Sequence, residues 1–187
     1  MNTVLFVCTA NRCRSPVAEA LLKKHIAASP RPNAGDPPHR AEAETTAAHA
    51  SDSAWLVRSA GTWAHTGLTA HPHTQMAANA LGLDLQHHRS CGVEDIRPLS
   101  FFRLILTMER GHKESLCFEF PEIADRVYQL SELIGHQYDV PDPIGRSLAR
   151  HRTMIQQIDE LITAGLPQLV TLATGYATQE MAGTIPT

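Results

Sequence analysis

The sequence predicts a single α/β domain built around a parallel β-sheet. Four short segments, at residues 3–7, 55–60, 104–108 and 127–130, are expected to be strands, and the first is continuously apolar and rich in β-branched residues, as strands buried on both faces are. Helical patterns separate these segments, and strands that alternate with helices are typical of a parallel sheet. The length of 187 residues suits one packed domain. In such folds the functional loops lie at the carboxyl ends of the strands.

The first unit of the chain is a strand, a short polar loop and a helix. The apolar run Thr3–Val7 predicts the strand, and Cys8 lies at its carboxyl end. After polar residues 9–14, Ser15 and Pro16 have the types favoured at a helix N-cap and at the first helical position. Apolar residues then recur at helical spacing, at Ala18, Leu22 and Ile26.

The segment 29–53 differs from the rest of the chain in composition. It contains four prolines, many alanines and no apolar residue larger than alanine, so it cannot contribute much to a core. We therefore expect an exposed insertion at 29–53 within a domain that spans residues 1–170. A C-terminal tail is expected over 171–187.

The second strand and second helix follow the insertion. Trp55–Ala60 predicts the strand, which Gly61 ends. Pro72–Leu81 predicts the helix, and Gly82 lies just beyond its end.

The second half of the chain continues the alternation. Leu104–Met108 predicts a third, buried strand and Val127–Leu130 a short fourth strand, with a helical stretch around His112–Phe118 between them. A last helix is expected from Ser147 onward. One face of this helix is apolar, at Leu148, Met154, Ile155, Ile158, Leu161 and Ile162.

The last helix is expected to close at Gly165 and Pro167, because both residue types interrupt helices. These two residues and Gln168 also break the C-terminal apolar run. No stretch therefore approaches the roughly 18 to 20 apolar residues of a membrane helix, and no membrane insertion is expected.

Composition and charge exclude several classes of function. Hydrophobic residues make up 43% and charged residues 19% of the chain, which is ordinary globular usage. Sixteen Lys and Arg against nineteen Asp and Glu give a net charge of -3, so nothing draws the whole protein to nucleic acid or to an anionic membrane. The short apolar run after Met1 has no basic residue before it and is no signal peptide. We expect a cytoplasmic protein.

The four cysteines are better explained by chemistry than by disulfides or metal binding. Four are too few for a disulfide scaffold of this size, and none shows the paired spacing of a zinc site. The sequence thus predicts no metal site and no cofactor. Cys8 is followed after five residues by Arg14 and then Ser15. This pattern joins a strand end to a helix start, so that backbone N–H groups and the positive helix end point at one anion. A phosphate would fit.

Each side chain of this motif has a chemical task. The loop amides, the helix N-terminus and Arg14 all favour the thiolate of Cys8, which is the nucleophilic form. Arg14 can bind two phosphate oxygens at once. Ser15 can donate to the thiolate, and Asn11 tolerates the left-handed backbone of a tight loop. The alternative is that Cys8 is a small buried hydrophobe and Ser15 only a cap. The expected phosphate-binding residues are Thr9, Ala10, Asn11, Arg12, Cys13, Arg14 and Ser15.

Residues 4–20, Val-Leu-Phe-Val-Cys-Thr-Ala-Asn-Arg-Cys-Arg-Ser-Pro-Val-Ala-Glu-Ala, resemble the opening of the low-molecular-weight protein tyrosine phosphatases. The resemblance covers about residues 3–165 apart from the insertion, and the second half looks most like the bacterial branch associated with exopolysaccharide production. Further matching motifs, in the family's order, are Arg58-Ser59-Ala60-Gly61-Thr62, His88-Arg89, Leu104–Glu109 and Val140-Pro141-Asp142-Pro143.

The resemblance implies both a fold and an activity. The fold is a three-layer sandwich with a four-stranded parallel sheet in the order 2-1-3-4 and helices on both faces. The activity is metal-independent hydrolysis of phosphotyrosine through a phosphocysteine intermediate. The implied partner is a phosphotyrosine protein, with a bacterial tyrosine kinase as a candidate, and a monomer is the favoured state.

The resemblance also implies a role for Asp142. Tyrosinate is a poor leaving group, with a pKa near 10, so an acid must protonate it as the P–O bond breaks. Asp142 matches the family's acid, and as a base it would then activate the water that hydrolyses the phosphocysteine. Taken alone, an Asp between prolines is more often a turn residue.

Several residues depart from the family's pattern. Ile144 and Gly145 stand where relatives often have one or two Tyr residues in the substrate slot. Trp63 or His65 is a candidate for the slot instead, with the alternative that Trp63 simply packs. Arg12 replaces a commonly apolar loop residue and would favour acidic sequence around the phosphotyrosine.

Two other functions and one form of regulation stay open. A thioredoxin-coupled arsenate reductase shares the loop, but its relay needs further poised cysteines, and Cys91 and Cys117 are 26 residues apart. A phosphate-binding module without turnover is the other alternative, although all three expected catalytic residues are present. Cys13 is a candidate redox partner of Cys8, because many relatives have a second Cys at this position. Alternatively, Cys13 packs as a small apolar residue.

Overall fold

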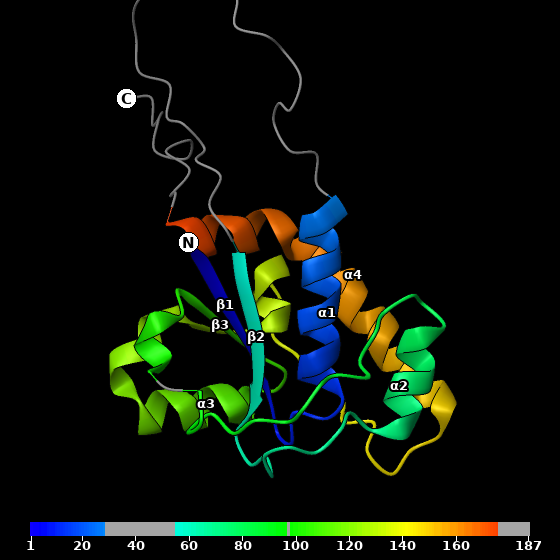
Figure 1. Ribbon diagram of the computed structural model, residues 1–187. Coiled ribbons are helices and arrows are strands. Elements are labelled where there is room, and N and C mark those ends of the chain that lie inside the picture. The colour runs from blue at the N-terminus through cyan, green and yellow to red at the C-terminus, as the bar shows by residue number, and fades with distance from the viewer. Residues whose placement is uncertain (29–54, 97, 176–187) are drawn as a thin grey trace, which may run out of the picture.

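The protein forms a four-stranded, all-parallel sheet with helices on both faces, as the sequence predicts (Figure 1). The computed structural model describes residues 1–28, 55–96 and 98–175. The strand order is β2-β1-β3-β4, which confirms the order that the family resemblance implies. The strands are β1 (Asn2–Cys8), β2 (Trp55–Gly61), β3 (Leu104–Thr107) and β4 (Val127–Gln129).

The register of the sheet brings three loops to one edge. β1 pairs with β2 over its whole length, so that Cys8 lies beside Gly61. On its other side β1 pairs with β3, and Val7 lies beside Thr107. The chain therefore leaves β1, β2 and β3 at the same carboxyl edge, which is where the functional residues of a parallel sheet are expected.

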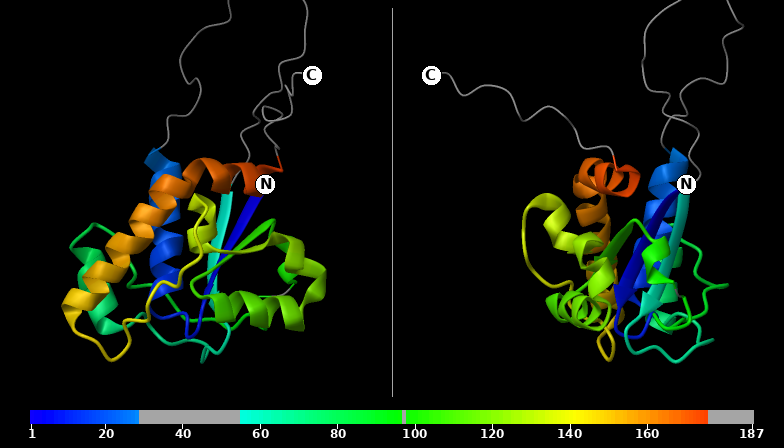
Figure 2. Two further views of the ribbon diagram at one scale, coloured as in Figure 1. Left: turned by 180° about the vertical axis from the view of Figure 1, so that it is seen from behind. Right: turned by 90° about the vertical axis from the view of Figure 1, so that its left-hand side faces the viewer.

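Helices cover the two faces of the sheet. The structure contains α1 (Arg14–Ala28), α2 (Pro72–Asn79), α3 (Arg110–Glu119) and α4 (Leu148–Thr174), with short 3-10 helices η1 (Leu99–Phe101), η2 (Pro121–Arg126) and η3 (Leu130–Ile134). Figure 1 and Figure 2 show α1 and α4 together on one side of the sheet and α3 on the other.

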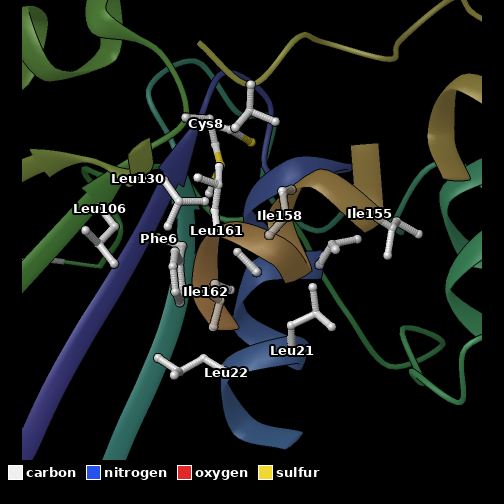
Figure 3. Close-up of a cluster of buried hydrophobic side chains, with 14 of the residues drawn as sticks. Phe6, Cys8, Leu21, Leu22, Leu106, Leu130, Ile155, Ile158, Leu161 and Ile162 are labelled. Carbon is white, nitrogen blue, oxygen red and sulfur yellow. The ribbon is translucent and has the colours of Figure 1, made fainter. Parts of the chain in front are cut away.

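Alternate side chains of β1 enter two different cores. Phe6 and Cys8 pack with residues of α1 and α4, whereas Leu5 and Val7 pack with residues of α3 and η2. Figure 3 shows the larger core, in which Phe6 and Leu106 of the sheet face Leu161 and Ile162 of α4. The sheet is thus buried on both faces, which explains why the first and third strands are continuously apolar.

Three helix ends differ from the sequence prediction. The first helix begins at Arg14, two residues before the expected first helical position at Pro16, so Ser15 lies within the helix and is not its N-cap. The second helix ends at Asn79 rather than at Leu81. The last helix was expected to close at Gly165 and Pro167, and this prediction is wrong because α4 continues to Thr174.

The reason is packing between α4 and η3. A Cβ atom on Gly165 would lie 2.6 Å from the Cβ of Leu133, so the glycine permits a close approach and does not end the helix. Beyond it, Leu169 and Ala173 are fully buried and stabilise the last two turns despite the internal Pro167. Gly175, with φ of 73°, follows as the left-handed end.

The predicted insertion at 29–53 lies outside the described residues and stays a prediction. Residues 171–174 of the expected tail belong to α4. Among the helices that the structure describes, none is both long enough and apolar enough to cross a membrane.

Candidate active site

The loop of residues 9–13, between β1 and α1, curls so that its two ends meet. The Cys8 Sγ lies 3.0 Å from the Ser15 Oγ, and both residues are buried. Asn11 has φ of 51°, in the left-handed region that asparagine tolerates. The Asn11 Nδ2 donates to the Ser15 Oγ and to the Ser59 Oγ, each at 2.9 Å. The side chain predicted to fix the loop is therefore in a position to do so.

Neighbouring segments hold the same loop from outside. The backbone N–H of Cys91 donates to the Asn11 Oδ1 at 2.9 Å, and the His88 Nε2 lies 2.7 Å from the Asn11 carbonyl. Gly61 lets β2 approach, because a Cβ there would lie 2.5 Å from the Thr9 carbonyl oxygen. The motifs around residues 58–62 and 88–89 thus support the loop from the next strand and the segment after α2.

Arg14 is the centre of the site's charge network. Its side chain is 1% exposed, and its Nη2 donates to the Asp142 Oδ2 at 2.7 Å. Its Nη1 forms an ion pair with Glu109 and donates to the Val140 carbonyl at 3.0 Å. Burial opposes the charge, but Cys8 and the two carboxylates more than offset it and raise the pKa of Arg14. The guanidinium stays charged at every physiological pH.

One buried donor in this network has no partner. Within the described part of the chain, the Arg14 Nε makes no hydrogen bond. A buried N–H without an acceptor is costly, and a bound oxyanion would supply one.

Asp142 reaches the site from the loop before α4. Its Oδ1 accepts a hydrogen bond from the Ile144 N–H at 3.1 Å, while its other oxygen contacts Arg14. The structure therefore brings together Cys8, Arg14 and Asp142, the three residues predicted to be catalytic, from segments more than 120 residues apart.

Comparison with known proteins identifies the family. A family model described as low molecular weight phosphotyrosine protein phosphatase matches residues 3–30 and 40–172. The chain belongs to this family. A protein-arginine-phosphatase from Bacillus subtilis (strain 168) is 31% identical over 167 residues, which cover 89% of this chain and 95% of that protein. The low molecular weight protein-tyrosine-phosphatase Wzb from Escherichia coli (strain K12) is 33% identical over 150 residues, which cover 78% of this chain and 80% of that protein.

Solved structures of the family share the fold. The YwlE arginine phosphatase from Geobacillus stearothermophilus has a TM-score of 0.71 at 27% identity and covers 96% of this chain and 100% of its own. Wzb from Vibrio vulnificus, in complex with benzylphosphonate, has a TM-score of 0.69 at 28% identity, and the match covers 89% of this chain and 98% of that one. This low molecular weight phosphatase chain thus matches these relatives over 80% to 100% of their length.

Two functional candidates in the structure were not predicted from the sequence. Glu109, which contacts Arg14, and His112, whose Nε2 lies 2.9 Å from the Thr9 Oγ1, both follow β3 at the carboxyl edge of the sheet. Burial lowers the pKa of His112 and keeps the ring neutral near pH 7. Glu109 lies in a motif that resembles the family, and its position after a buried strand was the available signal.

The candidate slot residues lie at the surface. Trp63 is 85% exposed and Ile144 is 46% exposed, and His65 is exposed too. The alternative that Trp63 simply packs is therefore wrong. Arg12 is half-buried, and its Nε donates to the Thr69 carbonyl at 2.9 Å. Beside the Asp142 loop lies a cleft of about 360 Å³ whose lining includes Arg146 and Arg150.

Cys13 is buried at the end of the loop and is a free thiol. Burial is the main cause that raises its pKa to about 12, against a contact with the Thr74 hydroxyl that lowers it. The Cys13 thiol is thus protonated at neutral pH.

Proposed function

We propose that this protein is a metal-independent protein tyrosine phosphatase that hydrolyses phosphotyrosine through a phosphocysteine intermediate. The observation that carries the proposal is the meeting of Cys8, Arg14 and Asp142 at one edge of the sheet. The unpartnered Arg14 Nε supports it, because a phosphoryl oxygen is the acceptor that this donor lacks.

The first half of the reaction transfers the phosphoryl group to sulfur. The Cys8 thiolate attacks phosphorus, an S–P bond forms, and the P–O bond to tyrosine breaks. Asp142 gives its proton to the leaving oxygen, so that tyrosine departs as a neutral phenol. Arg14 and the loop N–H groups stabilise the charge on the phosphoryl oxygens.

The second half returns the enzyme to its starting state. The Asp142 carboxylate accepts a proton from water, the water oxygen attacks phosphorus, and the S–P bond breaks to release inorganic phosphate. The Ser15 hydroxyl, 3.0 Å from the Cys8 Sγ, is placed to stabilise the thiolate that leaves. Glu109 keeps its contact with Arg14 throughout and acts as a positioning residue.

The decisive test is turnover of a phosphotyrosine peptide with matched variants. Wild type should release inorganic phosphate at an undiminished rate in the presence of a chelator. Cys8→Ser should abolish turnover, whereas Cys117→Ser, on the opposite face of the sheet, should retain it. A Cys8→Ser variant with more than a small fraction of activity would disprove the nucleophile assignment.

Phosphoarginine is a second candidate substrate, because two of the similar proteins are protein-arginine-phosphatases. The loop binds the phosphoryl group and suits either substrate, so the rim has to discriminate. A phosphoarginine side chain is larger and more polar than a phenyl ring. The positive Arg12 at the loop and Arg146 in the adjacent cleft are poorly suited to a guanidino group, whereas exposed Trp63 suits an aromatic ring.

Peptides of one sequence that carry either phosphotyrosine or phosphoarginine distinguish these substrates. We expect kcat/KM to be higher for phosphotyrosine, and Arg12→Thr to narrow the difference. A wild-type preference for phosphoarginine would assign the enzyme to the other class.

We also propose a cytoplasmic phosphoprotein substrate, with a bacterial tyrosine kinase of exopolysaccharide production as the candidate. The support is the family resemblance and similarity to Wzb and to a probable phosphatase, EpsP, from Ralstonia nicotianae, which is 26% identical over 169 residues.

Redox control of Cys8 by Cys13 is the last part of the proposal. Peroxide would oxidise the Cys8 thiolate to a sulfenic acid, and the Cys13 thiol would displace water from it to form a disulfide. Both thiols are free and buried, and they lie close enough to interact electrostatically.

A further inference from the structure

Three potential metal ligands from distant parts of the chain meet behind the phosphate-binding loop. Cys13 ends the loop, His71 is the N-cap residue of α2, and His151 lies in the first turn of α4. One ligand atom from each lies within 4.8 Å of those of the other two. A backbone hydrogen bond of 2.8 Å from the His71 N–H to the Arg12 carbonyl fixes the start of α2 against the loop.

His151 supplies an independent sign that this cluster is a ligand site. The residue is 0% exposed, and its Nδ1 lies 2.9 Å from the Thr74 Oγ1. Its Nε2 has no hydrogen-bond partner in the described part of the chain. The Pro143 carbonyl lies near enough to favour the charged ring but does not meet the geometry of a hydrogen bond to Nε2. A buried ring nitrogen without a partner is costly unless something binds it.

The surroundings of Thr74 indicate which His151 tautomer is present. The Thr74 hydroxyl contacts the Cys13 sulfur as well as His151. It has one proton, and when it donates that proton to the sulfur, its oxygen accepts from the His151 Nδ1–H. The neutral ring then has its lone pair on Nε2, the form that binds metals, with an outer partner that orients it.

The second histidine is only weakly committed elsewhere. The His71 ring stacks on His151, with centroids 4.8 Å apart and planes 13° apart. Its Nδ1 accepts from the His73 N–H at 3.3 Å, which is beyond the usual length of such a bond. Replacing this bond by coordination would therefore cost little.

We propose that Cys13, His71 and His151 form a binding site for Zn²⁺. One thiolate and two imidazoles are ligands that zinc prefers, with the fourth position left to water. Zinc bonds of about 2.0 to 2.3 Å in a tetrahedron place ligand atoms roughly 3.3 to 3.7 Å apart. The widest pair must therefore close by up to about 1 Å, and one imidazole must turn out of the stack so that the lone pairs of both rings point at the ion. Binding replaces the Cys13 S–H bond by an S–Zn bond and releases that proton to solvent.

Zinc in this site would act on the catalytic loop from behind. It would withdraw Cys13 from disulfide exchange, because a coordinated thiolate is not free to attack Cys8. Asp142 lies near enough to influence the charge of all three ligands, so a cation here would also be felt at the Asp142 loop. The sequence does not predict this site, because its three residues stand 58 and 80 positions apart and show no zinc-type spacing.

The test is metal binding to the full chain without an affinity tag, in a Cys8→Ser background that excludes the nucleophile as a ligand. Calorimetry should show one Zn²⁺ per chain with micromolar affinity or tighter. Co²⁺, as a spectroscopic substitute for zinc, should give a thiolate charge-transfer band. Both readouts are independent of phosphatase activity, so they stand even if the proposed function fails.

Ligand variants and matched controls decide the assignment. Cys13→Ser should remove the Co²⁺ band, and His71→Gln should weaken Zn²⁺ binding by roughly 10-fold or more, because even an outer partner contributes roughly 10- to 100-fold. His87→Gln and Cys117→Ser, away from the cluster, should leave the affinity unchanged. Thermal unfolding of each variant checks that it folds.

Two results would overturn the proposal. One is the absence of stoichiometric Zn²⁺ binding to the folded Cys8→Ser protein. The other is binding that is as tight in folded Cys13→Ser and His71→Gln variants as in the controls.

Discussion

Replacing the Asp142 carboxyl by an amide should slow phosphotyrosine hydrolysis in a way that depends on the leaving group. In the wild type, Asp142 accepts hydrogen bonds from the Ile144 N–H at 3.1 Å and from the Arg14 Nη2 at 2.7 Å. Asp142→Asn keeps the size of the side chain and one oxygen that can accept either of these bonds. The loop should therefore stay in place. The amide has no acidic proton to give, and loss of an acid of this kind costs roughly 10²- to 10⁴-fold in rate. At about 1.4 kcal/mol for each factor of ten, this is about 3 to 6 kcal/mol of transition-state stabilisation.

The assay is kcat/KM on a series of aryl phosphates whose phenols become steadily more acidic, because this ratio reports the steps up to departure of the phenol and not the later hydrolysis of the phosphocysteine, in which Asp142 also acts. The defect of Asp142→Asn should be largest on phosphotyrosine and phenyl phosphate, because these leaving groups need a proton most. It should shrink on nitrophenyl phosphates, whose phenolates leave without help.

The matched control is Asp139→Asn. This nearby carboxylate accepts hydrogen bonds from the Arg110 N–H and the Gln129 side chain and makes no contact with Arg14 in the described structure. It should lower stability without any dependence on the leaving group. If Asp142→Asn loses the same factor across the whole series, the acid role is refuted and Asp142 only orients Arg14.

Four further outcomes can be measured. Gly61→Ala should destabilise the protein by roughly 1 to 3 kcal/mol in urea unfolding, because the added Cβ would clash with the loop of residues 9–13. The control Gly111→Ala should not destabilise it, because no atom lies within 4 Å of a Cβ at that position. After peroxide treatment, dithiothreitol should restore the phosphatase activity of wild type, and peptide mass spectrometry should detect a disulfide between Cys13 and the nucleophile. Cys13→Ser should recover a smaller share of its own untreated activity, and equal recovery would contradict the redox role. Replacing residues 29–53 by a short Gly/Ser linker should leave the phosphatase activity within a few-fold of wild type, because loop-closure entropy depends only weakly on loop length. A loss of soluble expression would contradict the prediction that this segment is an exposed insertion. Burial lowers the pKa of His112 below its value of roughly 6.5 in the unfolded chain, so the unfolded state binds more protons at low pH. The free energy of unfolding should therefore fall as the pH is lowered from about 7 to about 5, and His112→Gln should make this fall smaller.

The parts of the fold predicted well are those in which local sequence and burial agree. Strands buried on both faces, such as β1, need continuous apolar runs, and such runs are visible in sequence. Gly165 shows the limit of this reasoning. In the sequence, a glycine that ends a helix cannot be told from a glycine that makes room for a neighbouring side chain such as Leu133. Only the packing of α4 on η3 shows that Gly165 is of the second kind.

The site was predictable to the same degree. Cys8, Arg14 and Ser15 stand within eight residues, and this spacing, together with the strand end before it and the helix start after it, indicates an anion loop. Glu109 was not predicted as a partner of Arg14, because the contact depends on β3 lying beside β1, and the strand order came from resemblance rather than from the strands themselves.

The two carboxylates on Arg14 differ in a way that explains how a substrate can enter. A phosphoryl dianion needs the guanidinium, and a guanidinium that already contacts two carboxylates must release one of them. Glu109 directly follows β3 and Met108, which are fully buried, so its backbone is fixed at the start of α3. The two side chains are similarly exposed, at 31% and 36%, but Asp142 stands on a loop in which Pro141 and Ile144 are exposed, so its backbone is held less firmly. Exchange at Asp142 is therefore the easier step, and it frees the carboxyl group beside the bond that it must protonate. In the proposed mechanism, the ion pair between Arg14 and Asp142 thus holds the carboxylate next to the phosphate site, and the carboxylate takes up its proton only after the substrate has displaced it from the guanidinium.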